Sequence, residues 1–302
     1  LLYQRQFGRP LRPGWDKEFA RDLLRTTAPY ALNMALGPIY LRIDVVMLTF
    51  FHGNTAAGLY EAATSIFYRF NVFARTINNA LMPLMAREFE LKTEQLSTYA
   101  NAAAKYQIAA GMPLSVGCVL LAGPLTKFMY GDGFELSSVV FRLLGTVITL
   151  RFLNNTLATA LTASDLQSER SVAVASAAVF NVVVNLFVVP AYSLIGTAIT
   201  TILTEVVFFA LLYLYLARRV SHPFDFGLLL KPSLAGSTMA VVLWLLRALP
   251  WLPALLLAGV AYLLVLLAVG TFTRQEVMVV MQIVRSSIDR SRGRRLAKGP
   301  LG

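Results

Sequence analysis

The chain has 302 residues, of which 57% are hydrophobic and only 14% are charged, and its mean hydropathy is +0.62. Soluble domains carry about 25% charged residues, so this composition excludes an ordinary soluble protein and indicates an integral membrane protein. The net charge of +11 lies mostly in the gaps between apolar segments, which is typical of membrane topology. No nucleic-acid partner is therefore expected.

Eight apolar segments follow one another along the chain, and most are about 20 residues or longer. They are too long for the strands of a membrane barrel, which need about 9–11 residues, so the predicted fold class is an all-α membrane protein. We expect spans at residues 28–51, 55–86, 104–128, 136–163, 170–190, 194–217, 229–248 and 252–272. Turn-forming residues separate them, for example at Gly53, Gly131 and Pro190.

The basic residues between the spans predict an orientation. Nearly all of them lie on the side that holds both ends of the chain, whereas the other side has only Lys127 and Arg247. The positive-inside rule then makes both termini of this chain cytoplasmic. Residues 274–290 show helical spacing of apolar residues between charges and predict an amphipathic helix on the inner leaflet, followed by a basic tail.

Charged residues inside the predicted spans are the strongest functional signal. The arginines are Arg42, Arg69, Arg75, Arg142 and Arg151, and the acids are Asp44, Glu61 and Glu205. A charge at the centre of a span costs about 2.5–3.5 kcal/mol, so these arginines cannot all face lipid and are expected to line a polar interior. Two positive charges lack an acid, and a diphosphate would supply negative charge that the arginine fork binds well.

The second span carries a polar stripe along one face at helical spacing. It consists of Glu61, Ser65, Tyr68, Arg69, Val72, Arg75, Thr76 and Asn79. One interpretation is a helix held to its neighbours by buried ion pairs such as Arg42 with Glu61. The other is the lining of a translocation cavity, which the excess of arginine favours.

Other polar residues in the spans support a site less strongly. Arg151 and Asn155 share a face of the fourth span, and Asn181 and Asn185 lie four apart on the fifth. Glu205, in the sixth span, is either a titrating carboxylate coupled to an ion or a fixed partner of an arginine or asparagine. The sequence has no nucleophile with its base, and two isolated histidines make no metal site, so we expect no cofactor and no metal.

Five segments, in order and spacing, are similar to a known family. They are Arg42–Leu48, Ala57–Ala63, Leu81–Pro83, Tyr130–Phe134 and the run from Asn181 to Glu205. Together they resemble the polysaccharide flippases, of the O-antigen type, in the multidrug/oligosaccharidyl-lipid/polysaccharide exporter superfamily.

The resemblance implies two six-helix lobes with two additional helices, of which this chain would be the second lobe and the additions. Residues 1–25 would then be the cytoplasmic loop between lobes, 26–217 the lobe, 218–273 the two further helices, and 274–302 the amphipathic helix and basic tail. The last two spans would suit contact with a lipid tail.

The function implied is the flipping of a lipid-linked oligosaccharide, of the undecaprenyl diphosphate type, across the bacterial cytoplasmic membrane. Partners would be the bilayer, this substrate and other polysaccharide-assembly membrane proteins. The expected cavity residues are Arg42, Asp44, Glu61, Arg69, Arg75, Asn79, Arg151 and Asn155, with Glu205 as the candidate for ion coupling.

Four alternatives stay open. The related lipid II flippases are the nearest, and Tyr60-Glu61-Ala62-Ala63, which departs from their usual second-span pattern, favours the polysaccharide branch. An ion-coupled exporter of cationic drugs should have an acidic cavity, which the arginines oppose. An enzyme would need a large outer loop for its catalytic groups, and all the outer loops are short, so no enzyme is expected. A purely structural partner is disfavoured by the charge imbalance.

Overall fold

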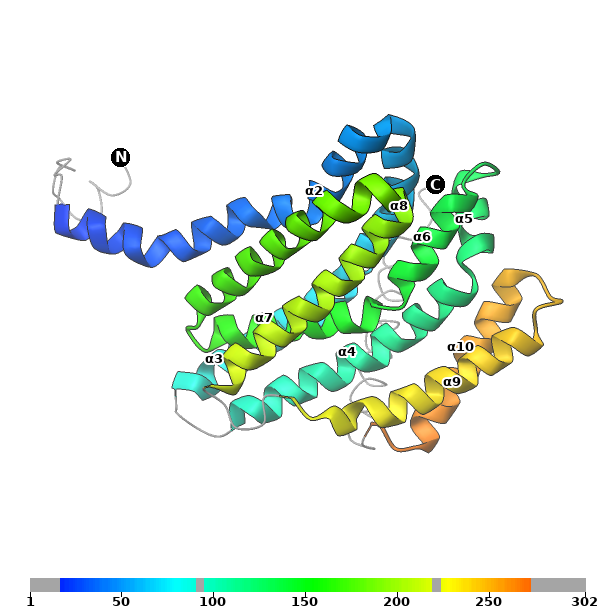
Figure 1. Ribbon diagram of the computed structural model, residues 1–302. Coiled ribbons are helices and arrows are strands. Elements are labelled where there is room, and N and C mark those ends of the chain that lie inside the picture. The colour runs from blue at the N-terminus through cyan, green and yellow to red at the C-terminus, as the bar shows by residue number, and fades with distance from the viewer. Residues whose placement is uncertain (1–16, 91–94, 219–223, 273–302) are drawn as a thin grey trace, which may run out of the picture.

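The computed structural model describes residues 17–90, 95–218 and 224–272, and the regular structure within these ranges is helical (Figure 1). In chain order the helices are α2 (Lys17–Arg69), α3 (Asn71–Glu90), α4 (Gln95–Leu120), α5 (Ala122–Tyr130), α6 (Glu135–Gly145), α7 (Ile148–Ala163), α8 (Gln167–Ala217), the 3₁₀ turn η1 (Phe226–Leu229), α9 (Leu230–Leu245) and α10 (Trp251–Ala268). The predicted amphipathic helix at 274–290 and the basic tail lie outside the described residues, as does most of the predicted inter-lobe loop.

Helices α2 and α8 each turn back on themselves, and Figure 1 shows both elbows at the same end of the molecule. The elbow of α2 is at Gly53, whose φ of 78° lies in the left-handed region that glycine adopts without strain. The elbow of α8 is at Ser193, with a φ of 48°. His52 joins the two elbows through a hydrogen bond of 2.8 Å between its Nε2 and the carbonyl oxygen of Val189. Both turns are where the sequence predicted them.

The second, third and fourth predicted spans are not continuous helices, and this corrects the sequence-based expectation. The second is interrupted at Phe70, between α2 and α3. The third bends by 79° between α4 and α5, and the fourth by 50° between α6 and α7. Short-range bonds satisfy some of the freed backbone groups, such as the 3.1 Å bond from the Phe73 amide to the Phe70 carbonyl. Interrupted helices are tolerated at membrane depth where protein or water surrounds them.

The composition of the described helices fits a membrane protein. Three helical segments are long and apolar enough to cross a membrane: α8, the segment Phe226–Leu245 and α10; counting each bent pair as one span gives five. Because α8 reverses at Ser193, its 51 residues supply two arms. The all-α membrane class predicted from the sequence is therefore confirmed.

Helices α9 and α10 form a hairpin that packs along one flank of α4 (Figure 1). A small residue permits the close approach, because a Cβ at Gly236 would lie 2.7 Å from Cγ of Met112. Tyr262 of α10 donates a hydrogen bond of 2.9 Å to the carbonyl oxygen of Ala109 in α4. Helices α2–α8 form a bundle that carries the charged residues of the predicted spans, and the α9–α10 hairpin is attached to one side of this bundle.

Candidate functional site

A buried ion pair joins α7 to α8 inside the bundle. Arg151 and Glu205 are only 7% and 2% exposed, and Nη1 of the arginine donates directly to Oε1 of the glutamate. Asn154 donates to the other carboxylate oxygen at 2.7 Å and to the Glu205 carbonyl oxygen at 3.0 Å. Glu205 therefore has dedicated partners, which favours the fixed-partner interpretation over a freely titrating carboxylate.

The remaining contacts of Arg151 tie it to the interruption between α2 and α3. Its Nε donates to Oδ1 of Asn71 at 3.3 Å, and its guanidinium lies 5.1 Å from the Phe67 ring centre and 4.7 Å from that of Tyr68. These residues flank Phe70, where the second predicted span is interrupted. Arg151 was predicted to line a substrate cavity; it is buried, joins α7 to α2, α3 and α8, and lines the small cavity described below, and its role toward a substrate stays a prediction. Asn71, which accepts from Arg151, and Asn154, which shares Glu205 with it, were not among the predicted site residues.

Asp44, on the first arm of α2, is the second buried carboxylate. It is 2% exposed and accepts hydrogen bonds from Asn185 at 2.9 Å, Thr201 at 3.0 Å and Tyr60 at 3.1 Å. Within the described part of the chain it forms no ion pair with a basic residue. Its charge is stabilised by neutral donors alone, in contrast to Glu205.

A small cavity lies between the two carboxylate clusters. It has a volume of about 10 Å³ and is lined by Asp44, Tyr68, Arg151, Asn181, Thr201, Thr204 and Glu205. That is close to the minimum space that one water molecule needs. The nearby Oδ1 of Asn185 is buried and has no hydrogen-bond partner. Oxygen ligands of this kind suit a small hard cation, whereas no group of three His, Cys, Asp or Glu side chains occurs among the described residues.

The polar face of α3 is exposed, and its opposite face is buried against α4 and α7. Asn78 on the buried face accepts from Gln107 at 3.2 Å and from Thr156 at 3.3 Å. Arg75 and Asn79, with Arg69 at the end of α2, are exposed. Among the described residues, no hydrogen bond or ion pair is formed by the side chains of Arg69 and Arg75. With Arg142 on α6, they are the three span arginines without an acidic partner in the described ranges, one more than the sequence count predicted, because Asp44 pairs with no arginine.

The other predicted residues are divided between these environments. Arg42 pairs with Glu61 at 2.6 Å, but their side chains are 67% and 37% exposed, so the pair that the sequence suggested exists without being buried. Asn155 is half-buried and donates to the backbone carbonyl of Arg151 at 3.0 Å. Arg142, on α6, is exposed. Buried charged clusters and interrupted helices beside an exposed cationic face are features found where membrane helices enclose a substrate path.

The family follows from the sequence comparison. The model of the family described as "Lipid II flippase MurJ" matches residues 1–271, and the chain belongs to this family. Among solved structures, "Lipid II flippase MurJ, inward closed conformation" is similar, with a TM-score of 0.71 and 17% identity over 84% of this chain and 55% of that one. "Outward-facing conformation of a multidrug resistance MATE family transporter of the MOP superfamily" has a TM-score of 0.58 and 16% identity, over 80% of this chain and 61% of that one. No curated protein sequence matches.

These comparisons confirm the superfamily but give no support to the O-antigen branch. They favour the lipid II alternative. The difference of Tyr60–Ala63 from the usual second-span pattern of lipid II flippases is therefore not a sufficient basis for choosing between the branches.

Family membership and the apolar helices indicate a multi-pass protein of the bacterial inner membrane. A flippase family transports and does not catalyse, which is consistent with the expectation of no enzyme. The chain spans 55% and 61% of the two solved structures; its division into a loop, lobe, added helices and tail stays a prediction.

Proposed function

We propose that this chain forms one part of a flippase that moves a lipid-linked glycan precursor, of the lipid II type, from the inner to the outer leaflet. The observation that carries the proposal is the pair of exposed arginines, Arg69 and Arg75, which have no acidic partner in the described part of the chain. The diphosphate that joins lipid to glycan is the group that they would bind.

The energetics of these two arginines argue for a polar environment. Facing hydrocarbon at mid-membrane, they would together cost about 5–7 kcal/mol, comparable to the roughly 5–15 kcal/mol of a folded protein's stability. A water-filled path removes this cost. The chain spans 55% of the solved lipid II flippase, and we propose that the rest of the protein closes the path opposite the α3 face.

The substrate class follows from charge and from the family. A cationic face disfavours positively charged drugs and favours a diphosphate, which offers several oxygens to the planar guanidinium fork. Lipid II and lipid-linked polysaccharide units share this diphosphate, so the arginines alone do not separate them. The family match over residues 1–271 favours the lipid II type.

Ion coupling fits Asp44 better than Glu205. Asp44 combines burial, the lack of a basic partner among the described residues, and an adjoining cavity of about 10 Å³. We infer that a small monovalent cation binds there and links the first arm of α2 to α8 through Asn185 and Thr201. Such binding would stabilise the conformation in which these helices are in contact.

The direct test measures flipping by the full-length protein in cells depleted of their own lipid II flippase. The double variant Arg69→Ala/Arg75→Ala is compared with Arg142→Ala, which removes an exposed arginine from α6 instead. Lipid II on the outer surface is measured by an enzyme added outside that cleaves it. The double variant is expected to lose exposure of lipid II, and Arg142→Ala to retain it.

Two results would overturn the proposal. One is normal lipid II exposure in the double variant with wild-type protein levels. The other is a wild-type protein that leaves lipid II inside while restoring a lipid-linked polysaccharide unit to the outer surface, which would return the chain to the polysaccharide branch.

A further inference from the structure

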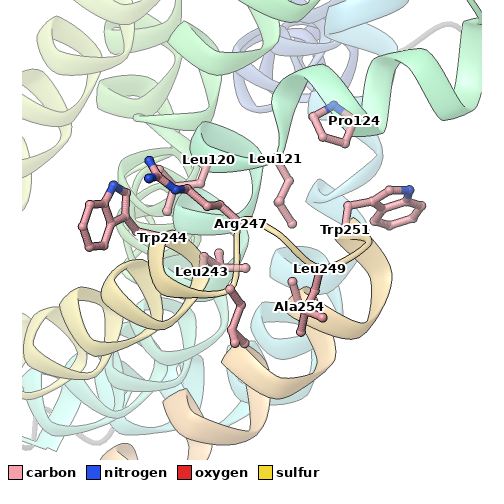
Figure 2. A pocket seen from close by; sticks show the side chains of 10 residues that line it. Leu120, Leu121, Pro124, Leu243, Trp244, Arg247, Leu249, Trp251 and Ala254 are labelled. Atoms are coloured by element: carbon pink, nitrogen blue, oxygen red, sulfur yellow. The ribbon is translucent and has the colours of Figure 1, made fainter.

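A second cavity lies away from the charged clusters, between the α4–α5 bend and the loop that joins α9 to α10 (Figure 2). Its volume is about 330 Å³, and it is lined by Leu120, Leu121, Pro124, Leu243, Trp244, Leu246, Arg247, Leu249, Trp251 and Ala254. The cavity adjoins the 79° bend after Leu120, and beside it the Phe128 ring of α5 contacts the Trp251 ring of α10, with ring centres 5.2 Å apart. The walls are apolar, with one charged side chain.

That charge, Arg247, is free to bind a ligand. It lies in the segment between α9 and α10, is exposed, and forms no ion pair among the described residues. Its guanidinium carbon lies 5.3 Å from the Trp244 ring centre, and Figure 2 shows it between Trp244 on one side and Trp251 on the other. Lys127 of α5, by contrast, is already paired with Asp132 at 2.6 Å.

The two tryptophans indicate the depth of the cavity in the membrane. Tryptophan concentrates where hydrocarbon meets headgroups, and Trp244 is 61% exposed at the end of α9. The leucines lining the cavity then lie toward the hydrocarbon, while Arg247 lies at headgroup level. By the predicted orientation this is the outer leaflet.

We propose that this cavity binds one anionic phospholipid of that leaflet, with its phosphate on Arg247 and an acyl chain against the leucines. The occupant is a bilayer lipid and not the flipped precursor for two reasons. The volume is at the lower end of the roughly 300–1,000 Å³ of ligand pockets, enough for part of one acyl chain beside Arg247 but not for a glycan headgroup as well. There is also one cation here, whereas a diphosphate is better matched by two.

The site gives the α9–α10 hairpin a role that is independent of the substrate path. A lipid held between α5 and α9 would cover the apolar walls of the cavity and set the position of the hairpin against α4. The proposal rests on the cavity, its single cation and its tryptophans, and it stands even if the proposed transport activity is wrong.

The test is photo-crosslinking on the full-length protein, reconstituted in phosphatidylcholine with a trace of phosphatidylglycerol that carries a photoreactive group in its acyl chain. We expect labelling at residues 120–124 and 243–254. Unlabelled phosphatidylglycerol should compete about fivefold better than phosphatidylcholine, the preference expected for one arginine beside an anionic headgroup. Arg247→Gln should abolish this preference, whereas Arg247→Lys should retain it.

Lys127→Gln is the matched control, because it removes a neighbouring charge that does not line the cavity, and it should leave the preference unchanged. Leu249→Trp, at a lining position that is 46% exposed, occupies the cavity, keeps Arg247 and should abolish labelling, which tests the site even if Arg247→Gln fails to fold. Equal competition by the two phospholipids, labelling elsewhere, or an equal loss in Lys127→Gln would overturn the proposal. Stronger competition by a lipid-linked diphosphate than by phosphatidylglycerol would assign the cavity to the substrate and also overturn it.

Discussion

The arginine on α7 and the arginines near the junction of α2 and α3 lie in opposite environments, although all of them occur within predicted apolar spans. Arg151 is 7% exposed and is neutralised by Glu205, with Asn71, Phe67 and Tyr68 around it. Arg69 and Arg75 are exposed, and neither has an acid beside it in the described ranges. The difference indicates two roles: Arg151 holds α2, α3, α7 and α8 together, and the exposed pair is available for a substrate.

The largest expected effect on stability comes from breaking the buried pair. Arg151→Ala leaves the Glu205 carboxylate buried without its counter-charge, and such a loss destabilises by about 3–5 kcal/mol. Thermal unfolding of the purified protein in detergent measures it. The double variant Arg151→Met/Glu205→Met should recover most of the loss, because it leaves no buried charge. If Arg151→Ala unfolds at the wild-type temperature, the structural role assigned to this arginine is wrong.

The roles of the two buried carboxylates, Asp44 and Glu205, can be distinguished by how cations change the unfolding temperature. A cation bound at Asp44 should raise the unfolding temperature of the wild-type protein, with a stabilisation of about 2.7 kcal/mol at a cation concentration one hundred times the dissociation constant. Asp44→Asn should remove this response, whereas Glu205→Gln should retain it at a lower starting stability. A cation response that disappears with Glu205→Gln and survives Asp44→Asn would reverse the assignment.

A smaller loss of stability is expected from a substitution on the buried face of α3, opposite the exposed arginines. Asn78→Ala removes the acceptor for Gln107 and Thr156, and a buried polar group left without its partner costs about 1–3 kcal/mol. Asn79→Ala, one residue along and exposed, should leave stability unchanged. Equal losses in the two variants would mean that both faces of α3 are packed.

The smallest effect should come from the pair Arg42 and Glu61. Their side chains are 67% and 37% exposed, and exposed ion pairs contribute about 0–1 kcal/mol. Glu61→Gln should therefore shift the unfolding temperature little in the isolated protein. A loss as large as that of Arg151→Ala would contradict the exposed position of this pair.

The sequence predicted the helical class and the positions of the turns because those features depend on local chemistry. The apolar lengths imply membrane helices, and Gly53 and the residues before Ser193 mark both elbows. The interruptions at Phe70 and Leu121 were not predicted. The one at Leu121 has a local signal, since Gly123 and Pro124 follow it and proline lacks a backbone amide. The one at Phe70 has no glycine or proline beside it and lies where Arg151 of a distant helix bonds Asn71.

The charge excess was predictable by counting, but the identity of the unpaired arginines was not. Pairing is decided by which residues face each other across α7 and α8, and helical periodicity assigns faces only within one helix. Arg151 and Asn155 were expected to line a cavity together, yet the asparagine that joins Arg151 in bonding the Glu205 carboxylate is Asn154, one position away. Tertiary packing therefore divided a set of residues that periodicity had grouped.

The most direct test of the claim that Arg69 and Arg75 bind substrate, whereas Arg151 is structural, is a binding measurement. It determines the affinity of the purified full-length protein for a short-chain lipid-linked diphosphate glycan and records the unfolding temperature on the same samples. Charge-assisted hydrogen bonds contribute about 1.5–3 kcal/mol each, so Arg69→Ala and Arg75→Ala should each weaken binding by roughly tenfold or more while the unfolding temperature stays at the wild-type value. Unchanged affinity in both variants, or an unfolding temperature that falls with the affinity, would contradict the account.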